Sequence, residues 1–137
     1  MQEHGLKISE LVTLFNLEVL NRGSDYDTAL LTITDVNRPG LQFHSFYDYF
    51  DPRRLQVLGK AEITYLKGLT TEQRRKCFDD LFLYDIPALV ISRGLDCFPE
   101  CLESARVHER TLLRTEETTV EFTSHTIEYL NRVLAPC

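Results

Sequence analysis

The sequence has no apolar window of the roughly 20 residues that a membrane-spanning helix needs. It also has no internal repeat and no low-complexity tract. With 43% hydrophobic and 26% charged residues, it is too hydrophobic for a disordered chain and too evenly mixed for a coiled coil. A length of 137 residues suits one compact core, so we expect a single domain over residues 1–137.

Basic residues are also scarce relative to acidic ones. The chain has 15 Lys and Arg against 21 Asp and Glu, which gives a formal net charge of −6. Proteins that bind nucleic-acid phosphates usually carry a basic excess or a clustered basic face. The one dense basic run, residues 74–76, falls in a predicted helix, where it is expected to form part of the solvent-exposed face. We therefore expect neither a nucleic-acid nor a membrane partner.

The N-terminal residues 1–4 are polar and lack the apolar core of a signal peptide. This pattern predicts a cytoplasmic protein in a reducing environment. In that setting the four cysteines are expected to be free thiols rather than a disulfide framework.

No phosphate-binding signature is present. The chain contains neither G-x-x-x-x-G-K-[ST] nor G-x-G-x-x-G, and Gly59-Lys60 is followed by alanine where the phosphate loop has Ser or Thr. We therefore expect no cofactor to bind to this segment by such a loop.

Three soft side chains could in principle hold a metal ion: Cys97, Cys101 and His108. Their spacing is not that of paired C-x-x-C motifs, and Cys101 lies on the apolar stripe of a predicted helix. A buried thiol is therefore the favoured interpretation, and no metal site is expected.

A catalytic triad is suggested by His44, Ser45 and Asp48, but nothing in the sequence marks a strained nucleophile turn around the serine. His125 falls on a predicted helix and is expected to have a packing or surface role. We therefore expect no catalytic residue in this segment.

Hydrophobic periodicity and turn signals predict alternating strands and helices. The Thr-x-x-Gln spacing from Thr70 predicts a capping box, and Thr118 or Thr119 should begin the last helix. Such alternation implies an α/β fold with a small sheet, at least partly parallel, and helices packed on it. The predicted strands are 18–20, 30–34, 55–58, 87–91 and 112–113, and the predicted helices are 8–15, 60–67, 71–82, one from residue 99 and one from 118 or 119.

Two loops that follow predicted strands combine arginine with glycine: Arg38-Pro39-Gly40 and Arg93-Gly94. In α/β sheets, ligands gather at the carboxyl ends of strands, where glycine permits close backbone approach and arginine binds anions. The candidate ligand-binding residues are therefore Arg38, Gly40, Arg93 and Gly94. The alternative is that the glycines serve backbone conformation and the arginines pair with nearby acids.

An aromatic segment lies between these loops. It contains Phe43, Phe46, Tyr47, Tyr49 and Phe50. Because the chain is acidic, we expect these rings to pack between the sheet and a neighbour rather than to stack on bases. Some of them should be exposed if another domain or subunit normally covers them.

Five blocks in this order resemble the N-terminal domain of bacterial HPr kinase/phosphorylase, and the resemblance extends over almost the whole chain. The blocks are FNLEVLN at 15–21, TDVNRPGL at 34–41, FYDYF at 46–50, RLQVLGKAE at 54–62 and PALVISRGL at 87–95.

The resemblance implies a parent enzyme that phosphorylates a serine of the phosphocarrier HPr with ATP or pyrophosphate and Mg²⁺, and reverses this by phosphorolysis, in carbon catabolite repression. Those steps belong to a C-terminal kinase domain that forms a hexamer and that is missing here. The implied role of this segment is noncatalytic regulation or assembly, on a fold similar to the N-domain of muramyl ligases. The alternative is a free-standing module that senses a phosphorylated metabolite or a uridine nucleotide.

Overall fold

The computed structural model describes residues 4–136. Residues 1–3, which contributed to the signal-peptide argument, and Cys137 lie outside the described residues. The strands are β1 (Leu6–Lys7), β2 (Glu18–Asn21), β3 (Leu30–Leu31), β4 (Val36–Asn37), β5 (Leu55–Leu58), β6 (Leu89–Ile91) and β7 (Leu112–Arg114). The helices are α1 (Ile8–Phe15), α2 (Gly40–Phe43), α3 (Lys60–Lys67), α4 (Thr71–Phe82), α5 (Pro99–Val107) and α6 (Thr119–Val133).

The main sheet has five strands in the order β2-β7-β6-β5-β4. Strands β4 to β7 run parallel to one another, and β2 joins the edge of β7 in the antiparallel sense. A separate two-stranded sheet pairs β1 with β3. The predicted α/β fold with a partly parallel sheet is confirmed.

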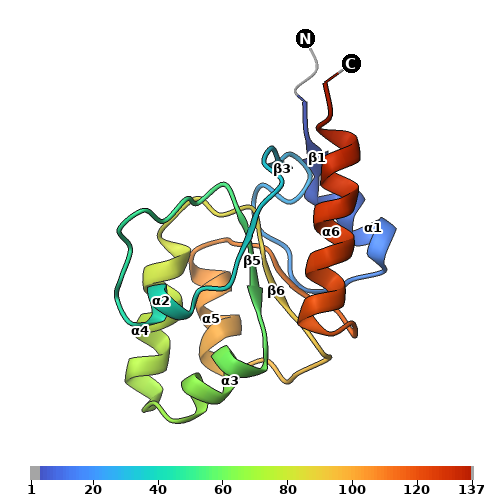
Figure 1. The fold of residues 1–137 in the computed structure, drawn as a ribbon. Helices are drawn as coiled ribbons and strands as arrows, with labels where there is room; N and C mark the ends of the chain where they lie inside the picture. Colours follow the sequence, from blue (N-terminus) through green and yellow to red (C-terminus); the bar gives the residue numbers. More distant parts are fainter. Residues whose placement is uncertain (1–3, 137) are drawn as a thin grey trace.

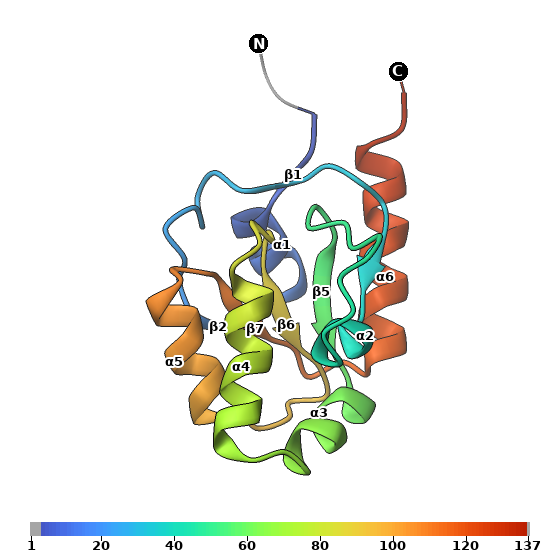
Figure 2. The ribbon, with the colours of Figure 1, turned by 90° about the vertical axis from the view of Figure 1, so that its left-hand side faces the viewer.

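Helices cover both faces of the main sheet (Figures 1 and 2). Helices α2 to α5 lie on one face, and α1 and α6 lie on the other. Because side chains alternate along a strand, neighbouring residues of β5, β6 and β7 enter different cores. Because β6 is buried on both faces of the sheet, residues 87–91 form a near-continuous apolar run in the sequence. Leu58, Leu89, Ile91 and Leu112 face one core, and Leu55, Val57, Val90 and Leu113 face the other.

Two helices begin with capping boxes; the one at α4 was predicted, and at α6 only the start of the helix was predicted. At α4, the Thr70 hydroxyl accepts from the Gln73 N–H at 3.1 Å, and the Gln73 side chain accepts from the Thr70 N–H at 3.0 Å. At α6, Thr118 and Glu121 make the same exchange, with both distances 3.1 Å. The hydrogen bonds from the backbone and hydroxyl of Thr118 lower the pKa of the Glu121 carboxyl.

The predicted strand over residues 30–34 is wrong beyond Leu31. In the antiparallel register Leu31 lies opposite Leu6, where β1 begins, so the β-branched residues that follow Leu31 have no residue of β1 opposite them. The strand that precedes Arg38 is instead β4, which was not predicted. Helix α2, which begins at Gly40, was also missed.

None of the helices between residues 4 and 136 combines the length and the apolar character needed to span a membrane.

Candidate functional site

The candidate site lies at the carboxyl edge of the parallel strands. Arg38 directly follows β4, Gly59 directly follows β5, and Ser92 to Gly94 directly follow β6. Because β4, β5 and β6 are neighbouring parallel strands, these segments meet at one edge of the sheet. The structure therefore brings the two arginine-containing loops to the same edge, with the end of β5 between them.

Arg38 is already paired with a buried carboxylate. Its Nε and Nη2 atoms each lie 3.1 Å from Glu62 Oε1, and the Glu62 side chain is only 9% exposed. The same carboxylate oxygen accepts a hydrogen bond of 2.6 Å from the Gly59 N–H, at the start of α3. Arg38 also packs over Gly59, where a Cβ atom would lie 2.5 Å from Arg38 Nη2. An anionic ligand would have to compete with Glu62 for this guanidinium.

Gly40 is the first residue of α2 and has open space around it. Apart from its chain neighbours and the backbone of α2, no atom of residues 4–136 would lie within 4 Å of a Cβ atom at this position. Neither crowding nor a positive φ therefore requires glycine here, which leaves close approach of a ligand as an open role for this residue.

Arg93 and Gly94 form a left-handed turn, with φ values of 60° and 59°. The Arg93 N–H donates to the Glu117 carbonyl and the Gly94 N–H donates to the Thr115 carbonyl, both at 2.8 Å. A Cβ atom at Gly94 would overlap the Glu116 carboxylate. The fold therefore accounts for glycine at this position and uses both backbone donors internally.

The Arg93 side chain is exposed, and no carboxylate of residues 4–136 forms an ion pair with it. Its positive charge contributes to lowering the pKa of Glu121, after the larger effect of Thr118. Of the two candidate arginines at the carboxyl edge, Arg38 is neutralised by Glu62, and Arg93 has no ion-pair partner among residues 4–136.

A buried hydroxyl pair at this edge was not found by sequence reasoning. Ser92 Oγ donates to the Leu58 carbonyl at 2.8 Å and accepts from Thr119 Oγ1 at 2.6 Å. Both residues are at most 5% exposed, so the pair ties the ends of β5 and β6 to the start of α6. The position of Ser92 directly after a predicted buried strand could have marked it as a buried polar residue. Its partner, Thr119, could not be found in this way because it lies 27 residues away in the chain.

His125 is a surface residue of α6, as predicted. Its Nδ1 atom lies 2.6 Å from Glu117 Oε2, and its side chain is 54% exposed. This histidine and carboxylate therefore form an exposed pair beside the Arg93 turn.

The other candidate groups from the sequence do not assemble into sites. His44 packs against Tyr65 with ring centroids 4.3 Å apart, and its exposed Nδ1 atom contacts the Tyr65 hydroxyl at 3.4 Å. His108 Nε2 contacts Asp79 Oδ1 at 3.4 Å, whereas Cys101 is buried in the core. Between residues 4 and 136, no three His, Cys, Asp or Glu side chains are grouped so that they could hold a metal ion.

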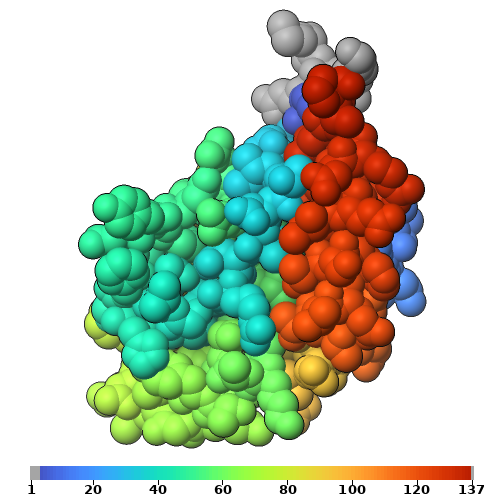
Figure 3. Space-filling view, viewed as in Figure 1, coloured from blue at the N-terminus to red at the C-terminus, as the bar shows by residue number. Residues whose placement is uncertain are grey.

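The aromatic segment divides into a buried and an exposed part. Phe43 is buried against Phe78, with ring centroids 5.6 Å apart. Tyr47 stacks on Tyr84 at 4.8 Å. Figure 3 shows the segment that follows residue 40, in teal, along the outer surface of the molecule. We call Phe46, Tyr47, Tyr49, Phe50 and Tyr84 the aromatic surface; Tyr49 is 99% exposed and Phe46 is 44% exposed.

Comparison with known proteins identifies the family. The model of the family described as "HPr Serine kinase N terminus" matches residues 6–130. The chain belongs to this family. The resemblance read from the five sequence blocks is thereby confirmed.

Several similar proteins are called HPr kinase/phosphorylase. The protein of Clostridium tetani is 41% identical over 132 residues, and that of Clostridium perfringens strain SM101 is 39% identical over 132 residues. The protein of Caldanaerobacter subterraneus is 39% identical over 131 residues. Each comparison covers 96% of this chain but only 42 to 43% of the relative. The chain therefore spans less than half the length of these curated relatives and corresponds to their N-terminal region.

A similar fold occurs in a crystal structure of the CBS and DRTGG domains of the regulatory region of Clostridium perfringens pyrophosphatase. The TM-score is 0.64, and the match covers 97% of this chain and 54% of the other. The two chains are 11% identical, so the comparison shows a shared fold alone. The expected similarity to the N-domain of muramyl ligases remains a prediction.

Proposed function

We propose that this chain is the noncatalytic N-terminal domain of a cytoplasmic HPr kinase/phosphorylase, and that it regulates or helps to assemble that enzyme. The observation that carries the proposal is the extent of the match. Nearly all of this chain, 96%, corresponds to 42% of a relative, and the matching family is described as an N terminus. The proposed enzyme phosphorylates and dephosphorylates a serine of HPr in carbon catabolite repression.

The proposal assigns phosphoryl transfer to the part of the enzyme beyond this domain. Transfer from ATP or pyrophosphate requires donors that cradle the phosphates and acidic residues that hold Mg²⁺. The glycine-rich phosphate loop that usually provides such donors is not found in these 137 residues. The proposed catalytic residues and cofactors therefore belong to the C-terminal domain, and HPr is a partner of the full enzyme.

The aromatic surface supports a role in assembly. Tyr49 has a φ of 62°, a left-handed conformation that costs a residue with a Cβ about 1 kcal/mol or more. The chain accepts this conformation while its tyrosine side chain stays 99% exposed, so packing within the domain does not explain the residue. We infer that the aromatic surface contacts the remainder of the enzyme in its homo-oligomer.

The test uses the Clostridium tetani relative in three forms: complete, without its matched N-terminal region, and with that region replaced by this chain. Phosphorylation of HPr is measured with ATP or pyrophosphate and Mg²⁺, and particle mass is measured by sedimentation. We expect the shortened enzyme to retain phosphoryl transfer but to change its mass or its regulation, and the chimera to restore both. This chain alone should transfer no phosphate.

A matched pair of variants in the chimera tests the aromatic surface. Tyr49→Ser should weaken assembly, whereas Val120→Ser, on the exposed side of α6, should not, although Val120 is 74% exposed. Phosphorylation of HPr by this chain alone would contradict the noncatalytic role. Identical mass, kinetics and regulation of the complete and shortened enzymes would contradict the role in assembly or regulation.

We also propose that Arg38, Gly40, Arg93 and Gly94 contribute to an anion site at the carboxyl edge. The supporting observation is that both arginine-containing loops lie at this edge and that the Arg93 side chain is exposed. Arg93 would make the first contact, and Arg38 would join it only after leaving Glu62.

A further inference from the structure

A hollow of about 200 Å³ lies at the carboxyl edge of the sheet, between α2 and the start of α3. Gly40 and His44 line it from the α2 side, and Ala61, Glu62 and Tyr65 line it from α3. Figure 2 shows the short helix α2 next to the start of α3. The hollow therefore lies at the edge where parallel sheets commonly bind ligands.

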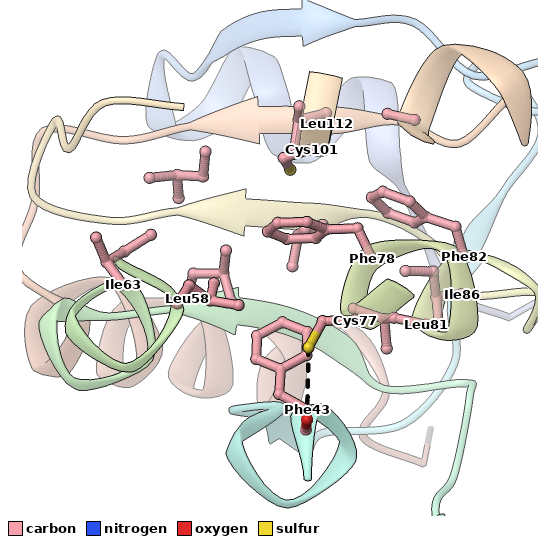
Figure 4. Close-up of a cluster of buried hydrophobic side chains, with 14 residues drawn as sticks. Phe43, Leu58, Ile63, Cys77, Phe78, Leu81, Phe82, Ile86, Cys101 and Leu112 are labelled. Atoms are coloured by element: carbon pink, nitrogen blue, oxygen red, sulfur yellow. Dashed lines mark hydrogen bonds between the residues drawn. The ribbon is translucent and has the colours of Figure 1, made fainter. Parts of the chain in front are cut away.

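Both walls of the hollow are fixed to the core. In α2, Phe43 packs against Phe78, and its carbonyl accepts a hydrogen bond of 3.4 Å from the Cys77 thiol (Figure 4). In α3, Ile63 belongs to the same buried cluster (Figure 4). The hollow is thus formed by anchored elements before any ligand arrives, as is usual for small-molecule sites.

Glu62 brings a nearly buried carboxylate with one unpaired oxygen to this hollow. Its side chain is 9% exposed, and its Oε1 atom accepts from the Gly59 N–H and from Arg38. Its second oxygen, Oε2, accepts no hydrogen bond from residues 4–136 and is not enclosed by them. Buried polar groups are nearly always hydrogen-bonded, and a carboxylate can only accept. Oε2 therefore indicates a ligand that donates a hydrogen bond.

The charges around Glu62 indicate that this donor is uncharged. Arg38 compensates the negative charge of Glu62 from the other side, so the carboxylate does not require a second cation. An anion that entered the hollow would face the lone pairs of Oε2 and be repelled. A neutral donor satisfies the oxygen without either cost.

The other lining groups favour a hydroxyl donor on a single ring. The Tyr65 hydroxyl and His44 Nδ1 lie 3.4 Å apart, and a phenol and an imidazole can each donate or accept. A ligand hydroxyl, which also does both, matches them and Glu62 alike. Ala61 and the Tyr65 ring provide apolar surface for ring C–H groups. The volume is below the roughly 300 Å³ at which pockets for drug-sized ligands begin, so it suits one ring.

We propose that this hollow binds an uncharged, polyhydroxylated ring such as a monosaccharide, one hydroxyl of which donates to Glu62 Oε2. A second hydroxyl contacts the Tyr65 hydroxyl or the His44 ring, and one face of the sugar covers Ala61. The site is distinct from the proposed anion site, because it needs the pair of Arg38 with Glu62 intact, whereas an anion has to break it.

The proposal is tested by NMR titration of the ¹⁵N-labelled chain with glucose and, separately, with ribose. At least one sugar should cause saturable shifts of the amide signals of Gly40, Ala61 and Tyr65. Tetrahydropyran, a ring without hydroxyl groups, should cause none. The proposal is overturned if neither sugar shifts these signals, if the shifts lie elsewhere, or if tetrahydropyran acts equally.

Three variants test the contacts. Glu62→Gln keeps an oxygen for the Gly59 N–H but can place an amide donor where Oε2 stood, so sugar affinity should fall roughly tenfold or more. Ala61→Leu fills the hollow with an apolar side chain and should abolish binding. Thr64→Leu, on the exposed side of α3 outside the hollow, should leave the affinity unchanged.

Circular dichroism checks that each variant is folded. Glu62→Gln also weakens the pair with Arg38, so Ala61→Leu, an exposed position in α3, keeps the test valid if that variant does not fold. Unchanged affinity in Ala61→Leu, or equal losses in Ala61→Leu and Thr64→Leu, would show that the sugar does not occupy this hollow.

Discussion

Arg74 Nη1 lies 2.6 Å from Glu100 Oε1, and this buried ion pair joins helix α4 to helix α5. The two side chains are 15% and 7% exposed. Arg74 also donates to the carbonyls of Leu66 and Leu69, at 3.0 and 2.9 Å, and its guanidinium lies 4.6 Å from the centre of the Phe98 ring. The guanidinium is therefore held on several sides, and it depends on Glu100 for charge compensation.

Glu100→Gln should destabilise the domain by about 2 to 3 kcal/mol, because it leaves the buried Arg74 charge without a counter-ion. The measurement is urea unfolding at pH 7. Lys76→Gln is the control, since Lys76 forms a solvent-exposed pair with Asp80 and exposed pairs contribute little to stability. Equal effects of the two substitutions would contradict the structural role of the buried pair.

Glu100 also makes the stability of the domain depend on pH. Burial opposes ionisation of Glu100, but its own backbone N–H and the Arg74 guanidinium outweigh this and hold the pKa below the ordinary value of 4.5. The folded state thus binds fewer protons than the unfolded state, so this stabilisation is complete above pH 4.5 and is lost as the pH falls through the folded-state pKa.

Urea unfolding between pH 6 and pH 3 should therefore show the native chain losing its advantage over Glu100→Gln as acid is added. Hydrogen bonds with Arg53 lower the pKa of Asp51 to about 2. Asp51 titrates in both proteins, so its effect on stability cancels when the two proteins are compared. An advantage that stays constant or grows toward acid pH would show that Glu100 has no lowered pKa.

Gly94→Ala and Gly40→Ala should have different effects on stability. At Gly94 the positive φ alone should cost about 1 to 2 kcal/mol, and contact with the Glu116 carboxylate adds to this. At Gly40 the added methyl group meets nothing within 4 Å, so the free energy of unfolding should be unchanged or slightly higher.

Glu116→Ala combined with Gly94→Ala separates the two causes at Gly94. The double variant should recover the part of the loss that comes from the carboxylate and keep the part that comes from φ. Comparable losses at Gly94 and Gly40, measured by urea unfolding, would contradict the backbone account of Gly94.

The proposed anion site predicts a ligand-dependent increase in melting temperature. Phosphate, sugar phosphates and nucleotides are screened by thermal shift against the native chain. Arg93→Ala should abolish any stabilisation, and Arg38→Ala should weaken it. The control is Arg53→Ala, which removes an exposed arginine that is paired with Asp51 and lies outside the site. No stabilisation by any of these anions, or equal loss in all three variants, would remove the proposal.

Local signals were sufficient for most helices and strands. The Thr70 and Thr118 capping boxes depend on residues three positions apart, so the start of each helix could be predicted from the sequence. The apolar run before Ser92 predicted a strand buried on both faces for a similar reason, because burial on both sides removes the polar alternation. The strand predicted over residues 30–34 was wrong beyond Leu31 because a strand needs a partner. Its partner, β1, begins opposite Leu31, and nothing within residues 30–34 indicates this.

In the candidate site, too, the sequence indicated features that depend on nearby residues and missed those that depend on distant ones. The sequence placed Arg93 after the correct strand, but it placed Arg38 after residues 30–34 rather than after β4, the strand that brings Arg38 to the same edge as Arg93. It could not assign Glu62 to Arg38, 24 residues away, or the hydroxyl of Thr119 to Ser92.

The sequence by itself determined the family, the α/β class and most of the secondary structure, because these depend on order, periodicity and nearby residues. Only the tertiary structure decided which charges are neutralised and which thiol is accessible. Among residues 4–136, Arg38 has an ion-pair partner and Arg93 has none, and Cys97 lines a cavity while Cys101 lies in the core. Charge pairing and burial depend on distances between elements that are far apart in the chain, and folding alone sets those distances.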